Sequence, residues 1–205
     1  MLNINKEGEV LNPRIRLARS LPLEHGPMEK VNGIIVHQTG APSARSTLNS
    51  YTQPRASGAH FLIDRDGTIY QTASVYRRTW HVGALRARCL VRHSCSPAEL
   101  KTYNDLMKHR GWAIAIGKLE AKKAPPDRYP SNVDSIGIEL VGDATPHNSP
   151  KDKLVHYQAA TPAQNSSLSW LIGELKSSMN VPMTEIFRHP EVSYKNSHEA
   201  ESARW

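Results

Sequence analysis

The nine residues from Val31 to Thr39 constrain this chain more than any other stretch, because a short apolar run ends there in His37 and two further polar residues. Four of its first six residues are valine or isoleucine, whose branched side chains suit a sheet. The run is too short for a helix and too continuous for a half-exposed strand. It predicts a buried strand that presents His37 at a cleft, where rigid strands meet loops. One such histidine is more often structural than catalytic, so its role depends on partners elsewhere.

Three further stretches predict strands. Residues 59–64 and 68–72 are rich in β-formers and are joined by Asp66-Gly67, which indicates a hairpin. Residues 134–142 alternate, so that Glu139 faces away from the isoleucines and leucine beside it. Residues 184–189 form a last short strand that ends in a second histidine, His189.

Helices are predicted between these strands. Ser96-Pro97-Ala98-Glu99 and Thr161-Pro162-Ala163-Gln164 each combine a hydroxyl cap with a proline at the first helical position, and the helices that follow should end near His109 and Asn180. A short helix is expected over 44–51 and a surface loop over the proline-rich residues 118–130. The fold class is therefore α/β, with a central mixed β-sheet flanked by helices.

Length and composition indicate one domain without a membrane segment. The 205 residues can bury a substantial core, and we expect an irregular N-terminal arm over 1–30, interrupted by three prolines, and one domain over 31–205. No apolar stretch is long enough to cross a membrane, and residues 1–30 lack the apolar core of a secretory signal. Cys89 and Cys95, six residues apart, fit a local disulfide or two free thiols.

The net charge of +7 favours a polyanionic partner, such as nucleic acid, an acidic membrane surface or the bacterial cell wall. The basic residues are spread along the chain, and no zinc-finger spacing, ribonucleoprotein motif or basic helix is present. We therefore do not expect nucleic-acid binding.

A metal site is compatible with two features of the sequence. Two apolar segments end in His37 and His189, and further donor residues follow near the C-terminus. Those donors are Lys195, Ser197, His198 and Glu199. Two histidines with one further donor, and a position left for water, are what a hydrolytic zinc ion requires.

At this point the chain resembles the zinc-dependent N-acetylmuramoyl-L-alanine amidases, the family of phage lysozyme-amidases and peptidoglycan recognition proteins. The resemblance covers residues 31–205 and rests on five segments in order. They are IVHQT (35–39), GAHFLIDRDGTI (58–69), WHVG (80–83), NVDSIGIELVG (132–142) and RHPEV (188–192). The family's fold, a mixed sheet flanked by helices, is what this resemblance implies here.

Residue by residue, the resemblance makes His37 and His189 ligands of Zn²⁺. Glu139 matches the glutamate that activates water in the cytoplasmic recycling branch, and Lys195 matches a lysine of the phage enzymes that would stabilise the oxyanion. Trp80 and His81 match positions that line the substrate groove.

The chain also departs from the family pattern. Ala59 occupies the position of a catalytic tyrosine of the phage enzymes, and Ser197 that of a cysteine ligand. The recycling branch places an aspartate ligand ten residues after the second histidine, and that spacing falls on Glu199 here. We expect Glu199 to be the third ligand, with the adjacent His198 as the alternative.

The resemblance implies hydrolysis of the amide between N-acetylmuramic acid and the L-alanine of the peptidoglycan stem peptide. A catalytically inactive peptidoglycan-binding module is the alternative, since a member that loses its third ligand can bind the wall without cutting it. The proline-rich insertion resembles injected antibacterial effectors, which predicts type VI secretion into the periplasm of a target cell, with an immunity protein or secretion component as partner. Release as a phage endolysin and cytoplasmic recycling are the other routes.

Overall fold

A mixed sheet forms the centre of the computed structural model, which describes residues 1–146 and 155–205. Its strands are β1 (Ile15–Leu17), β2 (Gly33–Gly40), β3 (Phe61–Ile63), β4 (Ile69–Gln71), β5 (Ser135–Pro146), β6 (Val155–Tyr157) and β7 (Ile186–Arg188). The order across the sheet is β1-β4-β3-β5-β2-β7, with β6 paired to β5. β3 and β4 are antiparallel, as are β5 and β6, and the other pairs are parallel.

The β3–β4 hairpin confirms the turn predicted at Asp66-Gly67. Gly67 has a φ of +88°, which glycine adopts without the strain that a side chain would bring. β5 begins one residue later than predicted and continues to Pro146.

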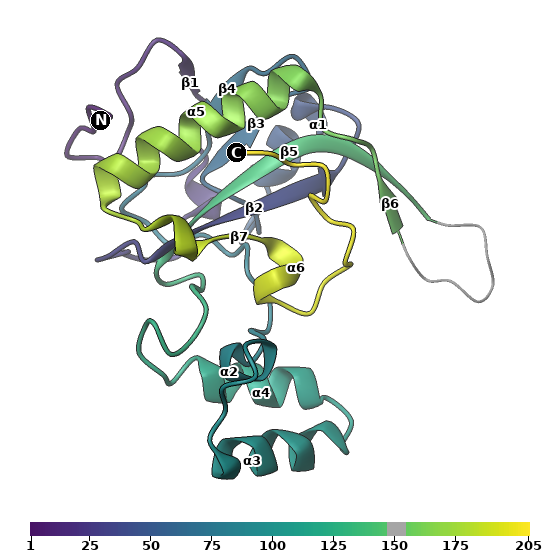
Figure 1. Cartoon of the computed structure of the whole chain (residues 1–205). Coiled ribbons are helices and arrows are strands. Elements are labelled where there is room, and N and C mark those ends of the chain that lie inside the picture. The colour runs from purple at the N-terminus through teal and green to yellow at the C-terminus, as the bar shows by residue number, and fades with distance from the viewer. Residues whose placement is uncertain (147–154) are drawn as a thin grey trace.

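The helices lie on both sides of the sheet (Figure 1). They are α1 (Ala44–Tyr51), α2 (Arg88–Val91), α3 (Pro97–Met107), α4 (Trp112–Glu120), α5 (Pro162–Met179) and α6 (His189–Val192), with 3₁₀ turns at Leu21–Leu23 and Met183–Glu185. The predicted helices at 44–51, 96–109 and 161–180 are confirmed, and both capping boxes are present at the starts of α3 and α5. Together with the sheet they confirm the predicted fold class.

Helix α5 covers one face of the sheet and buries the larger core (Figure 1). Its Leu168, Leu171 and Leu175 belong to the same cluster as alternate residues of the central strands. Because side chains alternate along a strand, the residues between them face the opposite side of the sheet. Along β2 this places His37 on the face away from α5, and along β5 it places Glu139 there.

Residues 1–30 are more regular than predicted. Strand β1 pairs in parallel with β4 at the sheet edge, so the expected irregular arm is wrong at Ile15–Leu17. Val10 and Met28 also pack into the larger core. Gln71 of β4 holds this segment, since its side-chain amide donates to the Gly8 carbonyl and accepts from the Val10 amide. A lone three-residue strand has too little periodicity to be recognised in the sequence.

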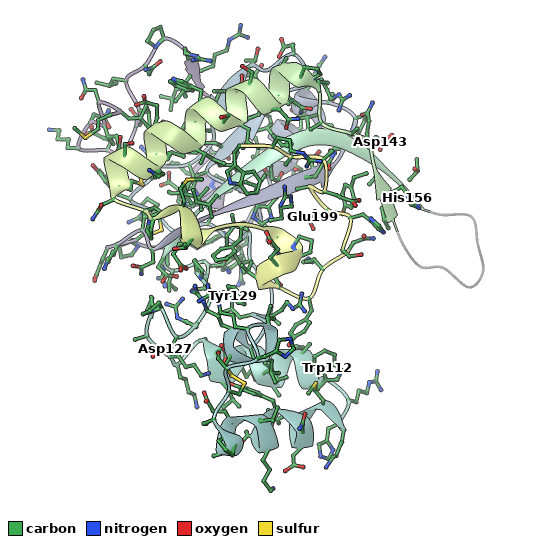
Figure 2. The ribbon with its side chains drawn as sticks, viewed as in Figure 1. Trp112, Asp127, Tyr129, Asp143, His156 and Glu199 are labelled. Atoms are coloured by element: carbon green, nitrogen blue, oxygen red, sulfur yellow. A yellow bond between two sulfur atoms is a disulfide. The ribbon has the colours of Figure 1, made fainter. Side chains whose placement is uncertain are left out.

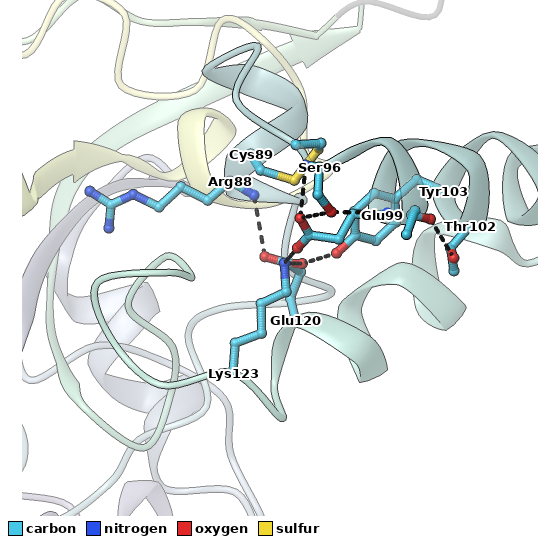
Figure 3. Close-up of a disulfide and its surroundings, with 10 residues drawn as sticks. Arg88, Cys89, Ser96, Glu99, Thr102, Tyr103, Glu120 and Lys123 are labelled. Atoms are coloured by element: carbon cyan, nitrogen blue, oxygen red, sulfur yellow. Dashed lines mark hydrogen bonds and ion pairs between the residues drawn. A yellow bond between two sulfur atoms is a disulfide. The ribbon is translucent and has the colours of Figure 1, made fainter.

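Residues 84–130, which we call the helical lobe, contain α2, α3 and α4 and extend from the sheet (Figure 1). The predicted surface loop over 118–130 is wrong at residues 118–120, because α4 continues to Glu120. Glu120 is buried and accepts hydrogen bonds from the Tyr103 hydroxyl and the Arg88 backbone amide, which join α4 to α3 and α2 (Figure 3). Its charge would cost free energy in this position without such partners.

A disulfide between Cys89 and Cys95 links α2 to the segment before α3 (Figure 3). It confirms the first of the two alternatives that the spacing left open. In the ranges 1–146 and 155–205, no helix combines the length and apolarity needed to cross a membrane.

The last predicted strand is shorter than expected. Met183–Glu185 form a 3₁₀ turn, β7 covers only Ile186–Arg188, and His189 is the first residue of α6 rather than the end of a strand. The proline that follows His189 suits this position, because a first-turn residue needs no backbone donor.

Candidate metal centre and catalytic pocket

His37 lies near the carboxyl end of β2, between β5 and β7. The residue is buried, with 2% of its surface exposed. The register between β2 and β5 places His37 opposite Glu139. The strand predicted from the sequence therefore delivers this histidine to the face of the sheet that α5 leaves free.

His189 reaches the same place from the neighbouring strand. β7 pairs with β2 up to Val36 and Arg188, so the residue after β7 lies beside His37. The two imidazole rings are 4.2 Å apart between centroids. Histidines separated by 152 positions in the sequence thus meet because their strands are parallel neighbours.

Glu199 completes the group from the C-terminal segment (Figure 2). The Oε1 atom of Glu199 lies 2.9 Å from Nδ1 of His189 and 3.4 Å from Nδ1 of His37. One ligand atom from each of the three residues lies within 4.8 Å of the others. The structure therefore brings together the three residues that were expected to bind zinc.

Electrostatics favour a neutral imidazole at His37 and an ionised carboxylate at Glu199. Burial is the main reason that the pKa of His37 falls from 6.5 to about 4. Burial alone would raise the pKa of Glu199, but interactions with the nearby rings of His189 and His37 outweigh it and lower the pKa to about 2. Near neutral pH His37 and Glu199 therefore have the charge states that a divalent cation needs.

These donors fit a zinc ion, because two neutral histidines and one carboxylate are an established ligand set for a hydrolytic site. The adjacent candidates lie elsewhere. Nδ1 of His198 is 2.8 Å from Glu201, and the side chain of Ser197 is exposed. Glu199, rather than His198, is therefore the residue that faces the two histidines.

Glu139 lies beside this group and is held by a residue that sequence reasoning missed. The Tyr51 hydroxyl, from the last residue of α1, donates a hydrogen bond of 2.7 Å to Oε2 of Glu139. Burial raises the pKa of Glu139 from 4.5 to about 7, and the hydrogen bond from Tyr51 opposes only part of that rise. The carboxylate can thus accept and release a proton near neutral pH.

The Tyr51 ring fits because Gly58 has no side chain. A Cβ atom on Gly58 would lie 2.3 Å from Cε1 of the ring, closer than two carbon atoms can approach. The same hydroxyl is 3.5 Å from the backbone nitrogen of Ala59. Little in the sequence indicated that Tyr51 belongs to the site, because the helix α1 that carries it is short and polar.

A pocket of 390 Å³ opens over these residues. Its lining includes all of the predicted site residues, namely His37, Trp80, His81, Glu139, His189, Lys195 and Glu199. Lys195 is exposed, which leaves its ammonium group free to approach a bound molecule. Trp80 is 37% exposed and stacks on the ring of His25 at 3.5 Å between centroids.

His81 lines the pocket and also forms a hydrogen bond with the ring of His37. Its Nδ1 lies 2.9 Å from Nε2 of His37, and its own Nε2 lies 3.3 Å from the carbonyl of Ser135. In the arrangement that satisfies both contacts, His81 donates through Nε2 to the Ser135 carbonyl, and its Nδ1 accepts a hydrogen bond from the Nε2–H group of His37. This fixes the tautomer in which Nδ1 of His37 is free to bind a cation.

His60, the residue before β3, is buried. Its Nδ1 accepts from the backbone amide of Gly137 at 3.0 Å, and its Nε2 lies 2.8 Å from the Arg77 carbonyl. These contacts use both ring nitrogens and connect β5 to the segment before Trp80.

Comparison with known proteins gives a family match over most of the chain. The sequence pattern of the Amidase_2 family, described as N-acetylmuramoyl-L-alanine amidase, matches residues 27–202. A search of curated proteins finds no match.

Several solved structures share the fold. A selenomethionine derivative of AmpD is 20% identical, with a TM-score of 0.53 over 93% of this chain and 88% of that one. A mutant endolysin from Bacillus subtilis is 18% identical, with a TM-score of 0.50 over 91% and 87%. The endolysin amidase LysCS from Clostridium intestinale URNW is also 18% identical, with a TM-score of 0.50 over 89% and 85%.

Proposed function

The chain belongs to the N-acetylmuramoyl-L-alanine amidase family, and we propose that it uses zinc to hydrolyse the amide between N-acetylmuramic acid and the L-alanine of the stem peptide. The family match confirms the family and the class of enzyme that the five sequence segments implied. The observation that carries the zinc proposal is the convergence of His37, His189 and Glu199 beside Glu139 in one pocket.

His37, His189 and Glu199 would hold the metal. When bound, zinc supplies Lewis acidity and lowers the pKa of a water molecule to about 7. Contacts within the site already orient the proposed ligands. His81 holds the tautomer of His37, and the carboxylate of Glu199 is already aligned with both imidazoles.

Glu139 would be the proton carrier. Its pKa of about 7 lets it take the proton of the attacking water and later deliver that proton to the leaving amine of L-alanine. The Tyr51 hydroxyl donates to Oε2 of Glu139, which leaves Oε1 of that carboxylate for this exchange.

Lys195 would stabilise the negative charge that develops on the carbonyl oxygen. It lines the pocket and is exposed, so its ammonium group can approach that oxygen. Trp80 offers an exposed aromatic face on which a sugar or peptide group can stack. No feature of residues 1–146 or 155–205 favours the inactive wall-binding alternative.

We further propose that the enzyme degrades the cell wall of a target cell, as an antibacterial effector or endolysin, and acts in the periplasm. The Cys89–Cys95 disulfide supports this, because disulfides persist in oxidising compartments and are rare in the cytosol. A secretion component or immunity protein is the partner that an injected effector requires. Expression in bacteria with and without a periplasmic export signal tests this proposal, and lysis only on export is the expected result.

The catalytic proposal is tested with purified protein, zinc and peptidoglycan sacculi. The expected result is release of stem peptides with a free L-alanine amine, and loss of that release in Glu139→Ala. Release of no peptide by the zinc-loaded protein would contradict the amidase proposal, as would undiminished release by the variant.

A further inference from the structure

A second hollow continues the catalytic pocket toward the helical lobe. It has a volume of 400 Å³ and shares Val82 and Gly83 with the catalytic pocket. Its far wall is the α4 helix, through Ile114 and Lys118. We call it the α4 groove. We propose, resting on the amidase function above, that the α4 groove binds the stem peptide beyond the amide that is cut.

The α4 groove is a built feature, because its two walls are locked together. Gly117 of α4 packs so closely that a Cβ atom there would lie 3.0 Å from the Leu85 amide nitrogen and 3.1 Å from Ala84. Ser193 fixes the same wall from the other side, donating from its hydroxyl to the Ala84 carbonyl at 2.9 Å. The Arg86 amide donates to Val192. The groove is therefore tied to the segment that follows His189.

The groove's lining suits a peptide with small apolar side chains. Val82, Leu85, Ile114 and Val133 supply apolar surface, and none of the residues that line the groove is aromatic. Ile114 is 61% exposed and Val133 is 46% exposed, so both present this surface to solvent. Saccharides are usually held by stacking on aromatic rings, which the pocket offers at Trp80 instead. The alanine methyl groups of a stem peptide match the α4 groove better than a glycan does.

The charge of the helical lobe matches the carboxylates of the same peptide. Residues 84–130 contain ten lysines and arginines against four acidic residues, and thus hold six of the seven net positive charges of the chain. Glu99, Asp105 and Glu120 are each already paired with lysine. Lys118 lines the groove and is exposed, and no ion pair joins it to a residue in 1–146 or 155–205.

Gly83 keeps the passage between the two hollows open. A Cβ atom on this exposed glycine would lie 3.2 Å from Oγ of Ser193 and 3.7 Å from Cε of Lys195. A larger side chain would therefore extend into the space between the catalytic pocket and the α4 groove. A peptide whose first amide lies beside Lys195 would pass Gly83 on its way to Lys118.

Two soluble substrates test the proposal. One is N-acetylmuramoyl-L-alanyl-D-isoglutamine, which ends soon after the cleaved amide, and the other is the N-acetylmuramoyl tetrapeptide, which carries further carboxylates. Lys118→Glu should lower the ratio of kcat/KM for the long substrate to that for the short one by about tenfold, as expected for loss of one charge-assisted contact. Lys6→Glu, the same change on an exposed lysine of the N-terminal segment, should leave the ratio unchanged.

Binding is measured separately so that the result does not depend on turnover. Calorimetry with the Glu139→Ala protein should show about tenfold weaker binding of the tetrapeptide substrate when Lys118→Glu is added. An unchanged affinity would overturn the α4 groove proposal even if the enzyme is an amidase. Weaker binding without hydrolysis by the wild-type protein would support the groove and contradict the catalytic proposal. The Lys118→Glu change could instead weaken the binding of substrates that carry an added N-acetylglucosamine, and not of substrates with a longer peptide. That result would assign the groove to glycan and overturn the proposal.

Discussion

The hydroxyl of Tyr51 lies 2.7 Å from Oε2 of Glu139, although 88 residues separate them in the sequence. Tyr51 is buried at the end of α1, and its hydroxyl donates to this carboxylate. A single donor on one oxygen fixes the rotation of the carboxylate and so aims the other oxygen into the pocket. The proposed proton carrier is thus oriented by a residue outside the family's motifs.

Tyr51→Phe should lower kcat by about 10- to 100-fold with little change in KM, because a misaligned proton carrier affects the reaction more than binding. Steady-state kinetics on a soluble muropeptide measure this. Tyr103→Phe is a matched control, since Tyr103 is equally buried and also donates to a glutamate, Glu120, within the helical lobe. In the Glu139→Gln background the Tyr51 substitution should have no further effect on kcat. An additive effect there would show that Tyr51 does not act through Glu139.

His81→Ala should weaken zinc binding by about 10- to 100-fold, the usual cost of removing a group that orients a metal-bound histidine. The physical reason is that His37 would then lose the partner that fixes its tautomer. Competition with a chromophoric chelator measures the affinity without any need for activity. Equal affinities in the variant and the wild type would mean that His81 serves the pocket only as lining.

His60 should make the fold sensitive to acid. Burial lowers its pKa from 6.5 to about 4, so between these values the unfolded chain binds a proton that the folded chain does not. The stability that depends on neutral His60 is complete above pH 6.5 and is lost as the pH falls toward 4. At about 1.4 kcal/mol for each pKa unit, the loss is at most about 3 kcal/mol.

Urea unfolding at pH values from 7.5 to 4 tests the role of His60. His60→Gln keeps a side-chain donor for the Arg77 carbonyl but cannot be protonated. The variant should be less stable at pH 7.5 yet lose less stability on acidification than the wild type does. Identical pH slopes for the two proteins would contradict the prediction.

Removal of the Cys89–Cys95 disulfide should destabilise the protein by about 2 kcal/mol, the value expected from chain entropy for so short a loop. Its sequence separation of six residues limits the effect. Thermal unfolding of Cys89→Ser/Cys95→Ser, compared with the wild type with and without reductant, measures it. The double variant should not respond to reductant, and a wild type equally indifferent to it would show that the bond does not form.

The strands, the hairpin and the two capped helices were predictable because local patterns encode them. The apolar run before His37 and the alternation around Glu139 each reflect burial on a sheet, and the capping boxes at Ser96 and Thr161 reflect unpaired amides at a helix start. The resemblance to the family's motifs predicted that His37, His189 and Glu199 form one site.

The parts that were missed depend on contacts between distant segments. β1 is stabilised by pairing with β4 at the edge of the sheet. The last turn of α4 is stabilised by the hydrogen bonds of Glu120 with α2 and α3. Tyr51 reaches Glu139 only because Gly58 leaves room for its ring. None of these relationships produces a periodic pattern in the sequence, so only the assembled fold reveals them.

Zinc content after exhaustive dialysis is the most direct test of the central claim, that His37, His189 and Glu199 hold one metal ion. Elemental analysis should find one zinc ion per chain in the wild-type protein and in His198→Ala, whose side chain bonds to Glu201 instead. Glu199→Ala should retain much less. Zinc that persists in Glu199→Ala but disappears in His198→Ala would contradict the account, as would a wild-type protein that binds none.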